Sequence, residues 1–166
     1  MCIRDRSATA GIDGQPATHY SWGCSFMDYD LDGWQDIIVA IGTLSINPST
    51  DPQPNNFFRN NGNGTFTEMA NTLGLDDDRP SRSAIYGDYD NDGDLDIYVV
   101  NYGDNCILNQ NNINNGNHWF KLHLEGTQSN QDGLGSKIEL TTPDGVTQHF
   151  ETVSYTHLTL PTICSV

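Results

Sequence analysis

Two short apolar runs stand out along the chain, and each follows a stretch of acidic and polar residues. The runs are IIVAI at 37–41 and IYVV at 97–100, and both consist mainly of β-branched and aromatic residues. Runs of this length and composition predict buried β-strands. The polar residues before each run predict a loop that leads into the strand.

Further strand patterns lie between and after these runs. NNFFRNNGNGTFTEMA at 55–70 predicts two short strands joined by the turn residues 61–64. WFKLHL at 119–124 alternates apolar and polar residues, as a half-buried strand does. SKIELTTPDGVTQHFET at 136–152 predicts a hairpin that turns at Pro143, Asp144 and Gly145. Helical periodicity is weak, so we expect an all-β fold.

A repeat connects the two apolar runs with the loops before them. SFMDYDLDGWQDIIVA at 25–40 aligns with IYGDYDNDGDLDIYVV at 85–100, and the aspartates, Tyr29, Gly33 and Ile37 of the first copy recur sixty residues later. A repeat unit of about sixty residues with several short strands is typical of a propeller blade or a comparable β repeat. We therefore expect a partial β-propeller of about two blades, followed by a small β domain.

The charge of the chain points to cations as partners. Asp and Glu number 22 against 7 Lys and Arg, which gives a formal net charge of −15. This balance argues against nucleic acid and anionic membranes as partners, and no apolar run is long enough to insert in a bilayer. DYDNDGDLD at 88–96 places five aspartates in nine positions. Such a density of like charge is costly in a folded loop unless a cation lies among the carboxylates.

The spacing of the aspartates favours calcium. Calcium takes about six to eight oxygen ligands, and D-x-D-x-D-G lets alternate carboxylates converge while the glycine allows a sharp turn. The ninth position supplies a further aspartate, and a strand follows where an EF-hand would have a helix. Magnesium fits less well, and zinc prefers His or Cys. The first predicted site consists of Asp28, Asp30, Asp32, the backbone carbonyl of Trp34, and Asp36; the second consists of Asp88, Asp90, Asp92, the backbone carbonyl of Asp94, and Asp96.

Two alternatives to a functional calcium site stay open on the residues alone. Asp, Asn and Gly are ordinary turn residues, so both loops can be solvated acidic turns. A metal that holds a loop against its own strand is also more often structural than catalytic, and we expect the structural role. No general base stands out beyond the loops, which leaves a calcium-dependent enzyme acting on polysaccharide or phosphate substrates as a weaker hypothesis.

The loops and the residues around them resemble a known family. D-x-D-x-D-G-x-x-D before an apolar strand is similar to the calcium loops of FG-GAP or VCBS repeats, the blades of integrin-type β-propellers, and NNFFRNNGNGTFTEMANTLGL is similar to the segment that follows. NHWFKLHLEGTQSNQDGLGSKIELTTPDGVTQHFET at 117–152 resembles the start of the ASPIC/UnbV domain found in bacterial secreted proteins and cartilage acidic protein.

The resemblance implies a function as well as a fold. It implies a calcium-stabilised adhesion or recognition module without catalysis, secreted or at the cell surface, that binds a protein or a glycan. A purely structural spacer is the remaining alternative. We expect FG-GAP/VCBS repeats over residues 8–112 and a partial ASPIC/UnbV domain over residues 113–152.

The two ends of the chain match one another as DNA. Met1 to Asp5 can be written ATG TGT ATA AGA GAC, and the reverse complement of these codons encodes residues 153–157, VSYTH. An inverted element of this kind resembles a sequencing adapter. We therefore expect residues 1–7 and 153–166 to be translated adapter and exclude both from the predicted domains.

Several other residues have more than one interpretation. Trp22, Trp34 and Trp119 can stack on a sugar ring, but we expect them to fill the core or brace a loop. We expect Cys24 to pack as a small apolar residue. A disulfide between Cys24 and Cys106 is possible in a secreted protein.

Overall fold

The structure is a computed structural model that describes residues 5–13, 19–44, 53–122, 124–127, 130–141, 145, 147–152 and 159–162. The fold is all-β, as predicted, and most of its described elements are antiparallel strands. Two four-residue helices accompany them, α1 (Ser7–Ala10) and α2 (Ala70–Leu73), and each ends at a glycine in the left-handed conformation. Among the described residues, no helix is long and apolar enough to cross a membrane.

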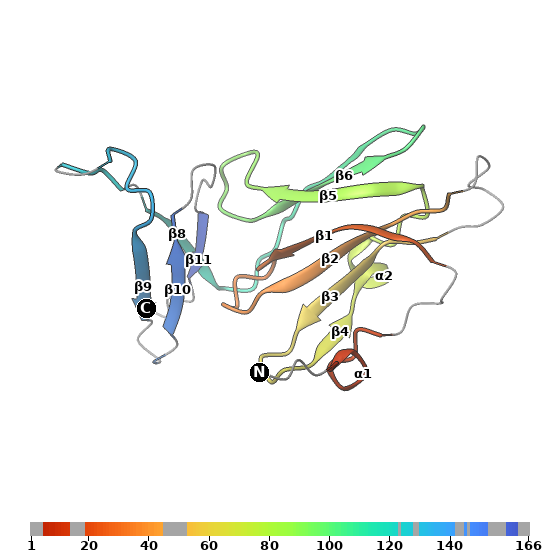
Figure 1. Ribbon diagram of the computed structural model, residues 1–166, viewed down its shortest axis with the longest axis horizontal. Coiled ribbons are helices and arrows are strands. Elements are labelled where there is room, and N and C mark those ends of the chain that lie inside the picture. Colours follow the sequence, from red (N-terminus) through yellow and green to blue (C-terminus); the bar gives the residue numbers. More distant parts are fainter. Residues whose placement is uncertain are drawn as a thin grey trace.

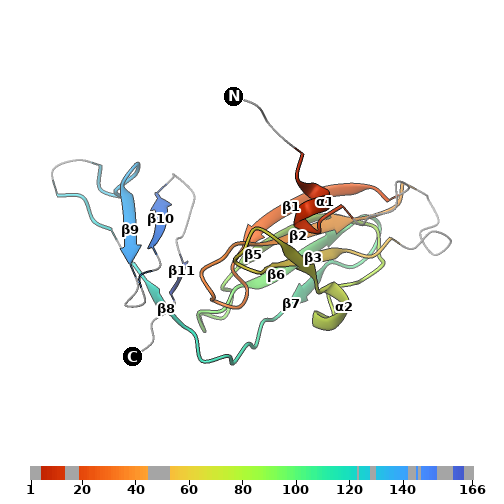
Figure 2. The same cartoon turned by 90° about the horizontal axis from the view of Figure 1, so that it is seen from below.

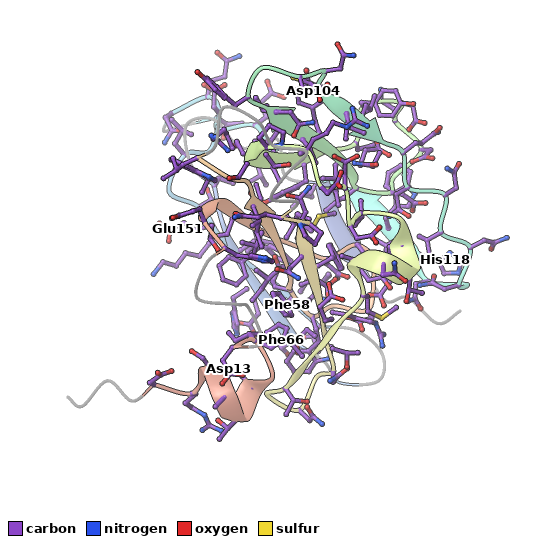
Figure 3. The ribbon with its side chains drawn as sticks, turned by 90° about the vertical axis from the view of Figure 1, so that its right-hand side faces the viewer. Asp13, Phe58, Phe66, Asp104, His118 and Glu151 are labelled. Carbon is purple, nitrogen blue, oxygen red and sulfur yellow. The ribbon has the colours of Figure 1, made fainter. Side chains whose placement is uncertain are left out.

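The first repeat forms a four-stranded antiparallel sheet in chain order. Its strands are β1 (Ser21–Met27), β2 (Asp36–Ile41), β3 (Asn56–Asn60) and β4 (Phe66–Glu68). β3 and β4 form the predicted hairpin, with Asn60 opposite Phe66. The backbone of Phe66 lies against Gly11 at the end of α1, so the N-terminal segment packs beside β4. In Figure 3, Asp13 lies next to α1, below the labelled Phe58 and Phe66.

The second repeat forms a three-stranded sheet with the same register. Its strands are β5 (Ser81–Gly87), β6 (Asp96–Asn101) and β7 (Ile107–Asn109). Phe26 pairs with Ile37 in the first sheet, and Tyr86 pairs with Ile97 sixty residues later. The register also shifts at matching places, between residues 21 and 23 and between residues 81 and 83. The repeat in the sequence is therefore a repeat in strand pairing.

The two sheets pack face to face around one apolar core. β5 lies against β1 and β2, and Figure 1 shows β5 and β6 stacked over β1 and β2. The buried core draws on both sheets and on the segment that connects them; its members are Met27, Ile38, Ala40, Phe57, Ala70, Leu75, Ala84, Leu95, Ile97 and Val99. Stacked antiparallel sheets of this kind are consistent with neighbouring blades of a partial β-propeller.

The C-terminal part contains two separate strand pairs, which Figure 2 shows to one side of the stacked sheets. β9 (Lys137–Thr141) and β10 (Thr147–Glu151) form the predicted hairpin. Of its predicted turn residues, Pro143 and Asp144 lie outside the described residues. β8 (His118–Lys121) starts one residue before the predicted strand and pairs with β11 (Thr159–Thr162), which lies in the range predicted to be adapter.

The structure corrects the prediction for Cys24 and favours one of the two alternatives for the tryptophans. Cys24 does not pack as a core residue, because it is exposed on the edge strand β1, and both Cys24 and Cys106 are free thiols. The tryptophans are 38–47% exposed, so none fills the core. The brace alternative describes them better. Trp34 lies over Gly62, Trp119 lies over Gly93, and the Trp22 indole donates a hydrogen bond to the carbonyl of Gly42.

Candidate metal centre

Each acidic loop joins the first two strands of its sheet. The first loop (residues 28–36) connects β1 to β2, and the second loop (residues 88–96) connects β5 to β6. The chain reverses direction through two left-handed residues in each loop, Leu31 (φ 56°) and Gly33 (φ 87°) in the first, Asn91 (φ 61°) and Gly93 (φ 98°) in the second. Glycine adopts this conformation without the steric cost that a side chain brings, which explains its place in the motif.

Three carboxylates converge in the first loop. Asp28, Asp30 and Asp36 each offer an oxygen atom, and these atoms lie within 4.8 Å of one another. All three residues are buried, with at most 5% of their surface exposed. Carboxylates are rarely buried without a partner, because the loss of hydration is costly. We call this group the first triad.

Backbone donors hold two members of the first triad in place. Asp36 accepts hydrogen bonds from the backbone N–H groups of Tyr29 (3.1 Å) and Asn60 (2.7 Å). Asp28 accepts from the N–H groups of Asp32 (3.0 Å) and Gly33 (2.7 Å). Asp36 therefore links its loop to the start of β2 and the end of β3.

Asp30 differs from the other two, because one of its oxygens has no protein partner. Its Oδ2 accepts a hydrogen bond from Arg59 Nε at 2.7 Å, whereas its Oδ1 is buried without a hydrogen bond. An unsatisfied buried carboxylate oxygen costs about 1–3 kcal/mol or more. The three aspartates supply only oxygen donors, and oxygen is the donor that calcium and magnesium bind. The residues therefore fit a hard divalent cation.

The second loop repeats this geometry. Asp88, Asp90 and Asp96 form the second triad, again with oxygen atoms within 4.8 Å of one another. Asp96 accepts hydrogen bonds from the N–H groups of Tyr89 (3.1 Å) and Asn111 (2.8 Å), just as Asp36 does in the first loop. Asp88 Oδ1 is buried without a hydrogen bond. The unpaired oxygen thus belongs to the first aspartate of this loop and to the second aspartate of the other.

The residue that contacts the second aspartate differs in charge between the loops. Phe58 pairs with Ile37 and Asn109 pairs with Ile97, so the next residues, Arg59 and Gln110, are equivalent. The Arg59 guanidinium contacts both Asp30 (2.7 Å) and Asp32 (3.0 Å). Gln110 contacts Asp90 at 2.6 Å through a neutral amide. A guanidinium from β3 therefore lies against the first loop, whereas a neutral amide lies at the equivalent place against the second.

Burial has a direct electrostatic consequence for the triads. Burial raises the pKa of Asp28 to about 7 and that of Asp36 to about 7, against the backbone hydrogen bonds that lower both. Burial also raises the pKa of Asp96 above the ordinary value, and neighbouring aspartates add to the rise. Asp28 and Asp36 therefore bind protons near neutral pH unless another cation takes the place of the proton.

The structure brings together six of the predicted ligands, the aspartates of the two triads. Two further aspartates accept hydrogen bonds from the loop backbone instead. Asp32 accepts hydrogen bonds from Trp34 N and Arg59, and Asp92 accepts one from Asp94 N. Neither belongs to the two triads. Coordination by Asp32, Asp92 and the carbonyls of Trp34 and Asp94 remains a prediction.

Sequence reasoning missed the contacts that β3, β7 and the following linker make with the loops. Arg59 and Gln110 lie at different distances in sequence from their loops, so only strand pairing shows that they are equivalent. The boundary predicted between residues 112 and 113 falls within the linker (residues 110–117), but the contacts of the linker with the loops were not predicted. The Asn111 side chain donates to the carbonyl of Tyr29 at 2.8 Å, and the side chains of Asn115 and Asn117 both donate to the carbonyl of Asp30.

Comparison with known proteins identifies the repeat. Residues 28–99 match the family model of the FG-GAP-like repeat. The match begins at the first aspartate of the first loop and extends through the second loop into β6. No curated protein matches the chain. The chain thus contains an FG-GAP-like segment, and its two acidic loops lie within that segment.

Proposed function

We propose that the protein is a calcium-binding, noncatalytic extracellular module for adhesion or recognition. The observation that carries this proposal is the duplicated triad of aspartates, in which each triad has a buried carboxylate oxygen without a hydrogen bond. The match to the FG-GAP-like repeat supports the same class of function. Calcium is favoured over magnesium because it accepts more ligands and less regular geometry.

In this proposal calcium stiffens the start of each blade. Asp28 follows β1 directly, and Asp36 is the first residue of β2. An ion bound to both carboxylates would hold the ends of these neighbouring strands together, and Asp88 and Asp96 would do the same for β5 and β6. The loops would then present a fixed surface to a protein or glycan partner.

The proposed location and the proposed metal support each other. Calcium sites in extracellular modules have dissociation constants on the order of 10⁻⁴ to 10⁻³ M, which suits the calcium level outside cells but not that in the cytosol. We therefore propose a secreted or cell-surface protein. Assignment of residues 113–152 to a partial ASPIC/UnbV domain belongs to the same proposal and rests on the resemblance of the sequence alone.

A calcium titration of the chain tests the metal site. We expect calcium to raise the melting temperature, because an ion that binds only the folded state stabilises it. Magnesium at the same concentration should have little effect. The double variant Asp30→Ala plus Asp90→Ala, which removes one ligand from each triad, should lose the response to calcium. A folded wild-type chain that ignores calcium up to about 10 mM would show that both loops are plain acidic turns.

A further inference from the structure

A series of hydrogen bonds connects the two triads through only two residues, Tyr29 and Asn111. The Tyr29 N–H donates to Asp36 at 3.1 Å, and the Tyr29 carbonyl accepts from the side-chain amide of Asn111 at 2.8 Å. The N–H of Asn111 in turn donates to Asp96 at 2.8 Å. Asp36 belongs to the first triad and Asp96 to the second. A continuous path of polar contacts therefore runs from one candidate metal site to the other.

The first repeat contains an equivalent of Asn111, which is Asn60. Both residues directly follow the equivalent pair described above, and both N–H groups donate to the last aspartate of their own loop. Both side-chain amides donate to the carbonyl before that aspartate, Gln35 at 3.0 Å and Leu95 at 3.4 Å, and both side-chain oxygens accept from the N–H two residues farther on. Within the described part of the chain, the donation to Tyr29 is the one bond of the Asn111 side chain that Asn60 does not reproduce.

The linker is attached to both loops by other amides as well. The Gln110 side chain donates to Asp90 in the second loop. The side chains of Asn115 and Asn117 donate to the carbonyl of Asp30 in the first loop. The linker therefore contacts the second aspartate of each loop, and its backbone is a longer route between the two sites than the route through Asn111.

We propose that Asn111 couples the two calcium sites, so that an ion in the second loop strengthens calcium binding in the first. An ion at the second triad would fix the Asp96 carboxylate and, with it, the N–H of Asn111. The side chain of Asn111 would then hold the Tyr29 peptide, whose N–H orients Asp36 for the first ion. Part of the entropy cost of ordering the first loop is thereby incurred when the second loop fills, which gives positive cooperativity. The inference rests on the calcium binding proposed above.

A calcium titration that follows each loop separately measures this coupling. Gly33 and Gly93 lie in different loops, so their signals in backbone-amide NMR spectra report the two sites one by one. Because the Arg59 guanidinium lies against the first loop, we expect the second loop to fill first and the first loop to report the coupling. Removal of the second site by Asp90→Ala should weaken calcium binding to the first loop by about fivefold or more.

Two further backgrounds show whether Asn111 carries the effect. Asn111→Ala removes the bond to Tyr29 but keeps the N–H that donates to Asp96. In this background, Asp90→Ala should change the affinity of the first loop by less than about twofold, as expected for independent sites. Asn60→Ala is the matched control, because it removes the equivalent local bonds but no bond between the repeats, and the full effect of Asp90→Ala should remain.

The same comparison controls for charge and for folding. Asp90→Ala removes one negative charge in every background, and about 0.15 M salt screens charge effects beyond about 8 Å. Asn111→Ser keeps a side-chain oxygen that can accept from the N–H of Ile113. Its side chain is one bond shorter than that of asparagine and should not reach Tyr29, so it should lose the coupling as Asn111→Ala does. Well-dispersed amide spectra verify that each variant is folded.

The outcomes separate this inference from the proposed function. If calcium up to about 10 mM, well above the affinity of extracellular sites, shifts neither the Gly33 nor the Gly93 amide, the proposed calcium binding is wrong and the coupling falls with it. If calcium binds both loops and Asp90→Ala leaves the affinity of the first loop unchanged, the coupling alone is wrong. An effect of Asp90→Ala that persists undiminished in both Asn111→Ala and Asn111→Ser would overturn the role of Asn111.

Discussion

Arg59 and Gln110 occupy the same position in the two repeats, and each contacts the second aspartate of its own loop. Only Arg59 brings a positive charge, and it bridges Asp30 and Asp32. A bound calcium ion in the first loop would lie close to this guanidinium and be repelled by it. The two proposed sites should therefore differ in calcium affinity because of this single side chain.

Exchange of these two residues should exchange the affinities of the sites. We expect Arg59→Gln to strengthen calcium binding to the first loop by about fivefold to tenfold, because a partly exposed ion pair is worth about 1 kcal/mol. Gln110→Arg should weaken binding to the second loop by a similar factor. Isothermal titration calorimetry would measure the first site in an Asp90→Ala background and the second in an Asp30→Ala background.

The stability of the metal-free protein provides the control for this exchange. In EDTA, Arg59→Gln should lower the free energy of unfolding by about 1 kcal/mol, since Asp30 and Asp32 lose their counter-charge. Unchanged calcium affinity of the first site after Arg59→Gln would contradict this prediction. It would mean that the Arg59 guanidinium moves away from Asp30 without cost when calcium binds.

Substitution of one aspartate in each loop should change the stability of the metal-free protein in opposite directions. Asp88→Asn should raise the stability in EDTA by about 1 kcal/mol, because it removes a like charge near Asp90 and Asp96. It should also weaken stabilisation by calcium. Asp36→Ala should lower the stability with or without calcium by about 1–3 kcal/mol, since the N–H groups of Tyr29 and Asn60 lose their acceptor. Urea unfolding in EDTA and in calcium would compare the two, and equal destabilisation in EDTA would contradict the different roles.

The stability of the metal-free protein should fall as pH rises toward neutrality. Burial raises the pKa of Asp28 and that of Asp36 to about 7 in the folded chain, against an ordinary value of 3.8. The folded state thus binds more protons than the unfolded state between these values, and this stabilisation is complete below about pH 4 and lost as pH rises through about 7. Calcium should replace the protons, flatten this dependence near neutral pH and release protons on binding.

Thermal unfolding between about pH 5.5 and 8, in EDTA and in calcium, checks the sign of this effect. An increase in EDTA stability toward pH 8 would contradict the raised pKa values. Asp36→Ala and Asp28→Asn should each reduce the pH dependence in EDTA, because each removes one of the two titrating groups.

The local pattern of the sequence predicted the loops and their strands, whereas long-range contacts escaped it. Alternating aspartates, a glycine and an apolar run are local signals, so residues 28–36 and 88–96 were found with their strands. Arg59 and Gln110 reach the loops only through strand pairing, and connections of different length hide their equivalence. The exposure of Cys24 also depends on which face of the first sheet the second sheet covers. Local patterns do not specify that choice.

The contact between Gly93 and Trp119 joins the second loop to the C-terminal part of the chain. A Cβ atom at Gly93 would overlap the indole of Trp119, and the φ of 98° at Gly93 also disfavours any side chain. Gly93→Ala should therefore destabilise the protein both by backbone strain of about 1–2 kcal/mol and by displacing the indole. In a Trp119→Ala background the second effect is absent, so only the strain should remain.

A double-mutant cycle on the free energy of unfolding separates these effects. We expect Gly93→Ala to cost at least about 1 kcal/mol more with Trp119 present than without it. Gly64→Ala is the matched control, because Gly64 also has a positive φ of 83° but has no neighbour in the way of a Cβ atom. Its cost should be the same in both backgrounds. Equal costs for Gly93→Ala in the two backgrounds would show that Trp119 does not rest on the second loop in solution, and the link between that loop and β8 would then depend on the linker alone.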